Sequence, residues 1–157
     1  MATTLTAVPS LNDLSLYIPE LKTRRKDSAL AELVARAHDA GTVRDAGLLL
    51  ELLRVREKVG GSALGKGVAV PHARSVTVLR PQLLVARALQ GIDWSAPDHT
   101  PVTLILLALS PAEWSEEAHH AFLGRAVGAA RLQRNRQRLL AASSFDAMAT
   151  VLRELSA

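Results

Sequence analysis

The sequence predicts an α/β fold, a single-domain sandwich in which a mixed β-sheet is flanked by helices on both faces. Apolar residues recur at helical spacing in four segments, which predicts four helices around a sheet. Short apolar runs between them read as strands, and the run 102–109 is apolar on both faces, as in a sheet covered on both sides. With 157 residues, no internal repeat and no linker, residues 1–157 are expected to form one domain.

Two helices are predicted in the first half of the chain. Asp27 or Ser28 can cap the first, which ends before Gly41 and places His38 on the surface of its last turn. The second runs from about Asp45 to Val59 and stops at the glycine pair that follows. The first helix is defined by Leu30, Leu33, Val34 and Ala37; the second carries a stripe of Leu48, Leu52, Val55 and Val59, with Leu49 and Leu53 beside it.

Three strands are predicted in the middle of the chain. Val68–Val70 is a short run cut off by Pro71, which lacks the N–H needed to continue a ladder. Leu83–Leu89 and Val102–Leu109 are longer, and the second ends at Ser110–Pro111. Loops at strand ends are the natural place for a site in such a sheet.

Two further helices are predicted at the C-terminal end. Ser115 caps a helix to about Leu132, with Glu116 in its first turn where a carboxylate suits the helix dipole. Ser143 with Asp146 resembles a capping box and opens the last helix. The last helix is expected to turn Met148, Val151, Leu152 and Leu155 inward.

The composition excludes several classes of structure and function. Hydrophobic residues make up 48% and charged residues 22%, which excludes disorder, and the absence of Cys excludes disulfides and catalytic thiols. The longest apolar run, Val102–Leu109, is far below the roughly 20 residues that span a bilayer, so no membrane insertion is expected. The first ten residues do not resemble a secretory signal, so a cytoplasmic location is expected.

The net charge of +4 and a run of arginines raise the question of nucleic acid. Arg131, Arg134 and Arg138 fall on one helical face by their spacing, and Arg136 lies between them. No aromatic residue interleaves this cluster, as stacking on single-stranded nucleic acid would need. A solvated helix face is therefore favoured over docking to an acidic protein surface or a DNA-binding role, and no nucleic-acid partner is predicted.

The segment Gly65–Arg74 is the strongest chemical signal in the chain. Gly65 and Gly67 permit tight turns, and Pro71 stiffens the approach to His72 at a strand end. This arrangement pre-positions an imidazole at the end of the strand. The ordinary alternative is a buried or capping histidine.

This segment resembles the active-site signature of the fructose/mannitol-type enzyme IIA family of the bacterial phosphotransferase system, which includes nitrogen-regulatory enzyme IIA proteins. The resemblance rests on Arg56-Glu57-Lys58, Gly60–Leu64 and Gly65–His72, then on Gly91–Trp94, the strand ending in Ser110-Pro111 and the helix carrying His119. It covers a core of about residues 11–155. It implies that His72 accepts a phosphoryl group from a histidine-containing phosphocarrier protein.

The site residues follow from the same resemblance and from chemistry. Arg56 offers a planar fork of donors for phosphate, and backbone N–H groups of Gly65, Lys66 and Gly67 could assist. His119 aligns with the inward face of its helix and is preferred over His120 as the partner of His72. Adjacent histidines diverge on a helix, so a zinc site is not expected, and no cofactor is implied.

Two positions depart from the family pattern. Ser62-Ala63 stands where many members have Ser-Thr, which puts a hydroxyl contact to phosphate in doubt. Asp98-His99 stands where Asp-Gly is common, and His99 is interpreted as a loop residue.

The expected role is a phosphocarrier of nitrogen-type regulatory character, because the chain contains no sugar-transport module. The partner downstream would then be a regulated protein. A transport enzyme IIA that serves a fructose/mannitol-type permease subunit is the alternative, as is a binding module that no longer transfers phosphate. The sequence names neither the sugar nor the target.

Overall fold

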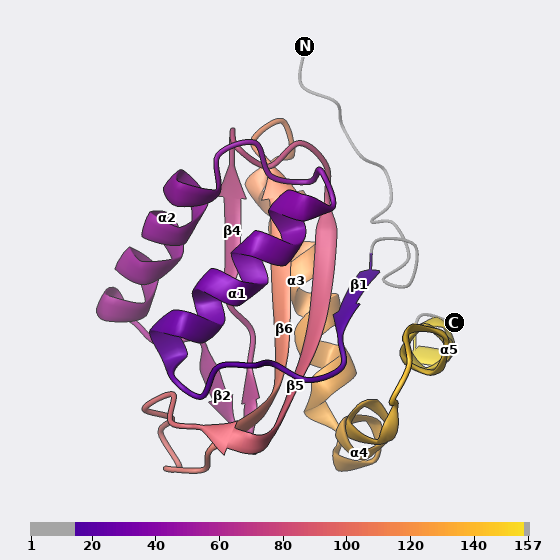
Figure 1. Ribbon diagram of the computed structural model, residues 1–157. Helices are drawn as coiled ribbons and strands as arrows, with labels where there is room; N and C mark the ends of the chain where they lie inside the picture. Colours follow the sequence, from indigo (N-terminus) through magenta and orange to yellow (C-terminus); the bar gives the residue numbers. More distant parts are fainter. Residues whose placement is uncertain (1–14, 156–157) are drawn as a thin grey trace.

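The computed structural model describes residues 15–155 (Figure 1). The first ten residues, which do not resemble a secretory signal, and residues 11–14 of the predicted core lie outside this range. The described elements, in chain order, are β1 (Ser15–Ile18), α1 (Lys26–Asp39), α2 (Ala46–Val59), β2 (Ala63–Gly65), β3 (Val68–Ala69), β4 (His72–Ser75), β5 (Gln82–Ile92), β6 (Val102–Pro111), α3 (Glu116–Arg131), α4 (Gln133–Ala141) and α5 (Phe145–Leu155).

The strands form one mixed six-stranded sheet in the order β1-β5-β6-β3-β2, with β4 also paired to β6. β5 and β6 are antiparallel, whereas β1 runs parallel to β5, and both β3 and β4 run parallel to β6. The predicted mixed sheet is therefore confirmed. It is larger than expected, because β1, β2 and β4 are absent from the sequence prediction.

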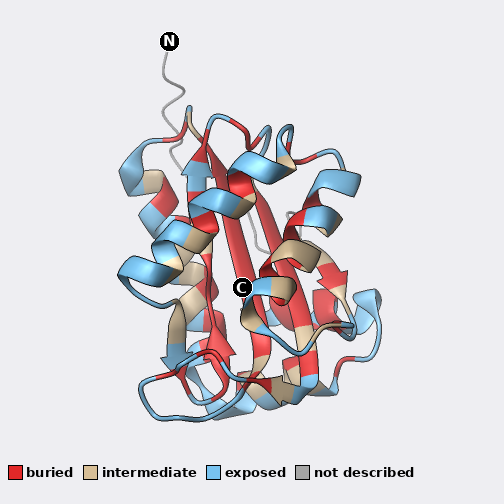
Figure 2. Cartoon of the chain, turned by 60° about the vertical axis from the view of Figure 1, so that its left-hand side comes forward, coloured by how far each residue is buried: buried red, intermediate tan, exposed pale blue. Residues whose placement is uncertain are grey.

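Helices cover both faces of the sheet, as predicted. α1 and α2 lie on one face and α3 on the other, with α4 and α5 beside β1 (Figure 1). Alternate residues of β6 serve the two layers: Ile105 and Leu107 pack with α1 and α2, while Leu104 and Leu106 pack with α3 and α5. Figure 2 shows the central strands as buried from both sides, which explains the continuous apolar run of β6.

β3 and β4 behave as one strand interrupted at Pro71. β3 pairs with β6 through Val68 and Leu104, and β4 resumes the pairing through His72 and Ala108. Between them the carbonyl of Pro71 accepts the N–H of Ala108 at 3.0 Å. Pro71 therefore breaks the strand as predicted, but the chain continues along β6, and His72 begins a second strand segment.

Two predicted helix caps are corrected. α1 begins at Lys26 after Arg25, which forms no side-chain cap, and Asp27 lies in the first turn, where it binds Arg54 of α2. The last helix is capped by Ser144, whose Oγ accepts the N–H of Ala147 at 3.1 Å, and not by Ser143. In contrast, Ser115 caps α3 as predicted, by accepting the N–H of Ala118 at 3.0 Å.

The apolar stripe of α2 faces outward. The helix buries Leu49 and Leu53 against the sheet, whereas the predicted stripe is at least partly exposed. Val59 is 87% exposed at the end of the helix. The exposed stripe consists of Leu48, Leu52, Val55 and Val59.

The arginine cluster does not form one helical face. α3 ends at Arg131, Leu132 is extended, and a separate helix α4 carries the other three arginines. Arg136 donates to the carbonyls of Ala130 and Arg131, and Arg138 pairs with Glu154 of α5. Two of the four guanidiniums thus stabilise the helical layer, which weakens the interpretation of the cluster as a binding surface.

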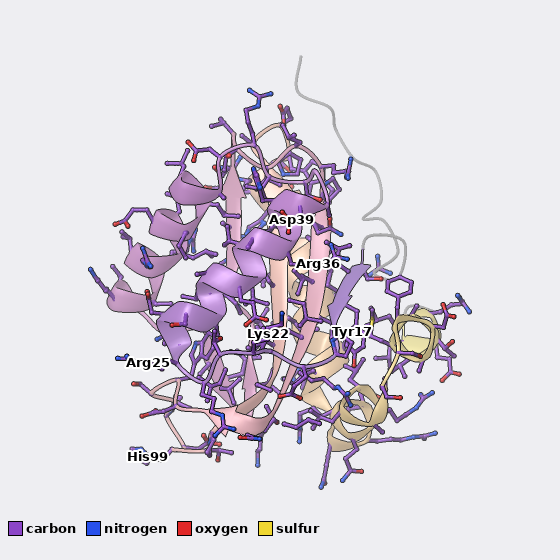
Figure 3. All side chains as sticks on the ribbon, viewed as in Figure 1. Tyr17, Lys22, Arg25, Arg36, Asp39 and His99 are labelled. Carbon is purple, nitrogen blue, oxygen red and sulfur yellow. The ribbon has the colours of Figure 1, made fainter. Side chains whose placement is uncertain are left out.

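The C-terminal helices are tied to the edge of the sheet. The hydroxyl of Tyr17 on β1 donates to the carbonyl of Ala142, which follows α4. Figure 3 shows Tyr17 between β1 and this pair of helices, and His99 at the tip of the loop between β5 and β6, in agreement with its prediction as a loop residue. Within residues 15–155, no helix has the length and apolar character needed to cross a bilayer.

Candidate active site

His72 lines a cavity of about 420 Å³ at the junction of α2 and the sheet. The cavity is bounded by the C-terminal turn of α2, the Gly60–Ser62 corner that follows it, and Pro71. Because Pro71 ends β3 and His72 starts β4, the imidazole lies at a strand break and is half-buried. The predicted placement of His72 at a strand end therefore has a local cause.

His119 of α3 is the direct partner of His72. Nδ1 of His72 and Nε2 of His119 are 3.2 Å apart, and the two rings are tilted by 41°. His119 is only 4% exposed, whereas His120 is exposed. The register of α3 thus turns His119, and not its neighbour, toward His72.

Ser110 of β6 completes a chain of three polar groups, and sequence reasoning did not include it. Its Oγ lies 2.8 Å from Nδ1 of His119, and the residue is fully buried. Ser110 follows Leu104, Leu106 and Ala108 on the face of β6 that packs against α3. The alternation of residues along β6 could have identified Ser110 from the sequence, because a polar side chain on a buried face needs a hydrogen-bond partner.

Both histidines are held in the neutral form. Burial lowers the pKa of His72, and the charges of Arg56 and His120 lower it further, while Glu57 opposes them. Burial lowers the pKa of His119 from 6.5 to about 4, with His72 the next contribution. At neutral pH each ring therefore carries one N–H and one lone pair, which a nucleophilic imidazole requires.

Arg56 borders the same cavity from the last turn of α2. The side chain is exposed, and its charge acts on His72 through the pKa shift described above. The helix ends at Val59 with Gly60 in an extended conformation, so the turn carrying Arg56 faces the chain as it returns to the sheet. The structure thus brings together three of the predicted site residues, His72, His119 and Arg56.

A second network, which the sequence did not predict, holds the wall of this cavity. Glu57 binds Lys26 of α1 at 2.7 Å and accepts the N–H and the hydroxyl of Ser62. The Ser62 hydroxyl in turn accepts the indole N–H of buried Trp94 at 3.1 Å. Ser62, which precedes the Ala63 that lacks the hydroxyl common in the family, therefore has its own hydroxyl engaged by these two side chains.

The predicted Gly65, Lys66 and Gly67 are not brought to His72. They form the turn between β2 and β3 with positive φ at all three positions, and Gly65 and Lys66 border a separate cavity of about 240 Å³ with Arg131 and Arg136. The amide of Lys66 donates to Asp98 at 2.8 Å. Asp98, which precedes the departing residue His99, thus occupies a donor that the sequence analysis assigned to phosphate.

The residues at the His72 cavity can carry out histidine-based group transfer. A neutral imidazole is fixed on one nitrogen by a second imidazole, and a guanidinium borders the space in front of it. Within residues 15–155, no group of three or more His, Asp or Glu side chains is arranged to hold a metal ion. Fold and site together place two contacting imidazoles and a guanidinium at one edge of a mixed α/β sheet.

The chain belongs to the family described as "Phosphoenolpyruvate-dependent sugar phosphotransferase system, EIIA 2", whose pattern matches residues 11–155. It is a phosphocarrier component of that system. It is 31% identical over 151 residues to the fructose-specific EIIA component of the phosphotransferase system of Haloferax volcanii, covering 96% of this chain and 97% of the relative. It is 35% identical over 135 residues to a nitrogen regulatory protein of Bradyrhizobium diazoefficiens, covering 86% and 87% of the two chains.

Solved structures show the same fold. The nitrogen regulatory protein IIA-Ntr from Neisseria meningitidis superposes with a TM-score of 0.80 at 24% identity, over 90% of this chain and 97% of that one. Enzyme IIAMTL of Escherichia coli, solved in complex with phosphorylated enzyme IIBMTL, superposes with a TM-score of 0.73 at 18% identity, over 88% and 94% of the chains.

Proposed function

We propose that His72 is the residue that carries the phosphoryl group, which it accepts from a histidine-containing phosphocarrier protein and passes to a downstream protein. The observation that carries this proposal is the contact between Nδ1 of His72 and Nε2 of His119. It fixes one ring nitrogen and leaves Nε2 as the nitrogen available to attack. His72 also borders the cavity that Arg56 shares, so an incoming phosphoryl group meets both residues.

The transfer needs no external acid or base. The lone pair of His72 Nε2 forms an N–P bond while the N–P bond of the donor phosphohistidine breaks, and the donor nitrogen keeps that electron pair. The proton on His72 Nδ1 stays in its hydrogen bond to His119. Onward transfer reverses the step, with the downstream acceptor as nucleophile.

Arg56 and His119 have different tasks in this mechanism. The Arg56 guanidinium stabilises negative charge on the phosphoryl oxygens in the transition state, for which its planar fork is suited. His119 holds the His72 ring in one orientation, and its depressed pKa keeps its Nε2 able to accept a hydrogen bond. A protonated His119 would lose this capacity and would repel a protonated neighbour.

The protein surface around the cavity suits a docking partner. Val55 and Val59 belong to the exposed stripe of α2 and also border the cavity of His72. The core of a protein interface is more apolar than the surrounding surface, so these exposed valines are suited to be covered by a partner. The phosphocarrier donor is therefore expected to rest on the C-terminal half of α2.

We favour a regulatory role of the nitrogen type, with transport through a fructose/mannitol-type permease subunit as the alternative. Relatives of both kinds match the chain, at 35% identity for the nitrogen regulatory protein and 31% for the fructose-specific component. A module that binds but does not transfer is disfavoured, because His72 and Arg56 border one cavity and His119 contacts His72.

The test is phosphorylation of the purified protein by a phosphorylated histidine phosphocarrier prepared with labelled phosphoenolpyruvate and enzyme I. We expect an acid-labile, alkali-stable label on His72, and its loss in His72→Ala with an unchanged circular dichroism spectrum. His38→Ala, an exposed histidine at the end of α1, is the matched control and should label fully. Full labelling of the His72→Ala protein would overturn the assignment. Transfer of the label to a phosphotransferase IIB domain would favour transport.

A further inference from the structure

We propose that Ser110 is a positioning residue for phosphoryl transfer, whose hydroxyl oxygen accepts the Nδ1–H of His119 and so selects the reactive tautomer of His72. This inference rests on the proposed phosphorylation of His72. It concerns a residue that touches neither the cavity nor the phosphoryl group. The contact that carries it is the 2.8 Å separation between Ser110 Oγ and His119 Nδ1.

The register of the sheet explains why these groups meet. His72 pairs with Ala108 and Arg74 pairs with Ser110 on the neighbouring strand, so His72 and Ser110 lie on the same face of the sheet, two residues apart along it. α3 packs against that face and inserts His119 between them. His119 is 4% exposed and Ser110 is fully buried, so water does not compete for these hydrogen bonds.

Two arrangements of protons are compatible with this geometry. In the first, His72 Nδ1–H donates to His119 Nε2, and His119 Nδ1–H donates to Ser110 Oγ. In the second, both rings take the opposite tautomer: the Ser110 hydroxyl donates to His119 Nδ1, and His119 Nε2–H donates to His72 Nδ1. A doubly protonated His119 is disfavoured, because burial lowers its pKa to about 4.

Only the first arrangement supports transfer. It leaves the lone pair on Nε2 of His72, which is the nitrogen not covered by His119. In the second arrangement that nitrogen carries a hydrogen and cannot attack phosphorus. The phosphorylated form needs the same first arrangement, because a neutral ring bonded to phosphorus through Nε2 keeps its hydrogen on Nδ1.

Ser110 stabilises the first arrangement by giving the buried Nδ1–H of His119 an acceptor. Without that oxygen the N–H is orphaned, and orphaned buried N–H groups are rare in proteins because they are costly. His119 would then place its hydrogen on Nε2, where the lone pair of His72 Nδ1 can accept it. His72 would in consequence hold its own hydrogen on Nε2, the unreactive tautomer.

The experiment compares Ser110→Ala with Ser110→Thr, which keeps a hydroxyl on a side chain suited to a strand. Long-range ¹H–¹⁵N NMR reads the tautomers of His72 and His119 in the unphosphorylated protein, and rapid quench measures phosphorylation by the labelled phosphocarrier. We expect wild type and Ser110→Thr to show His72 with hydrogen on Nδ1. Ser110→Ala should move the hydrogen to Nε2 and slow transfer at saturating donor by about tenfold or more, with unchanged half-saturation.

Ser110→Cys keeps the volume with a weaker acceptor and should give an intermediate tautomer ratio and rate. If Ser110→Ala folds poorly, Ser110→Cys still tests the role of the hydroxyl. Wild-type tautomers and rate in both Ser110→Ala and Ser110→Cys would overturn the role of Ser110, as would a wild-type His72 with hydrogen on Nε2. Those outcomes leave labelling of His72 intact, whereas a label elsewhere than His72 would overturn the proposed function itself.

Discussion

Nδ1 of His72 lies 3.2 Å from Nε2 of His119, although the two residues are 47 positions apart in the chain. One ring stands at a strand break and the other in the first turns of a helix packed on the opposite side of the sheet from α2. The contact fixes which nitrogen of His72 faces a partner.

Replacing His119 by Ala should slow phosphorylation of His72 and destabilise the fold. The change leaves the buried Ser110 hydroxyl and the His72 ring without their partner, which typically costs about 1–3 kcal/mol. His120→Ala is the matched control, since exposed substitutions usually change stability by less than about 0.5 kcal/mol. Transfer rates and thermal midpoints of both variants decide the matter. If His120→Ala is the more damaging, the assignment of His119 fails.

Arg56→Ala should slow phosphoryl transfer by about 10²-fold, because one donor to the developing charge is removed. Arg56→Lys should recover only part of the rate, since an ammonium lacks the planar fork. Lys58→Ala removes the same charge from the same end of α2 and should stay near wild type. Rapid-quench rates and half-saturation by the phosphocarrier are the measurements. If Arg56→Ala and Lys58→Ala slow phosphoryl transfer equally, Arg56 acts only through its net charge and not through direct contact with the phosphoryl group.

Acid should destabilise the protein through His119. The folded pKa of about 4 lies below the ordinary 6.5, so between these values the unfolded chain binds the proton more readily. The stability that neutral His119 contributes to the fold is fully present above pH 6.5 and is lost as the pH falls toward 4. Urea unfolding at several pH values should show this slope in wild type and a weaker one in His119→Asn. An NMR titration that places the pKa of His119 near 6.5 would contradict it.

Phosphorylation should stay fast below the pH at which an ordinary histidine is protonated. Burial and the charge of Arg56 lower the pKa of His72, so its Nε2 lone pair survives to lower pH. Single-turnover rates in wild type should hold steady from pH 7.5 to 6.5 and fall only in more acid buffer. In Arg56→Ala the acid limb should move to higher pH. A limb that does not move would show that Arg56 has no electrostatic influence on His72.

Glu57→Ala should destabilise the protein by about 2 kcal/mol, because it strips Lys26 and Ser62 of a partner that is 8% exposed. Asp27→Ala breaks an exposed pair between the same two helices and should barely change the urea midpoint. Fluorescence should report the local change, since Trp94 shares the Ser62 hydroxyl. If Glu57→Ala and Asp27→Ala lose equal stability, the Glu57 network stabilises the fold no more than the exposed Asp27–Arg54 pair does.

Much of this protein is determined locally by its sequence. The 3.6-residue period of α1, the two-sided apolar run of β6 and the Ser115 cap all specify their elements by themselves, because each depends on neighbours a few residues away. Pro71 likewise sets the strand break at His72, since it lacks an N–H whatever surrounds it. These features were sufficient to predict the fold class and the position of His72.

Only the tertiary structure decided which faces are used and which groups meet. The apolar stripe of α2 is exposed while Leu49 and Leu53 are buried, and no local rule distinguishes the two when both rows are apolar. The turn at Gly65–Gly67 is adjacent to His72 in sequence, but an extended chain carries it to another cavity. Ser110 joins the site because sheet register and helix packing bring three distant segments together, and long-range packing of this kind leaves only a faint trace in a single sequence.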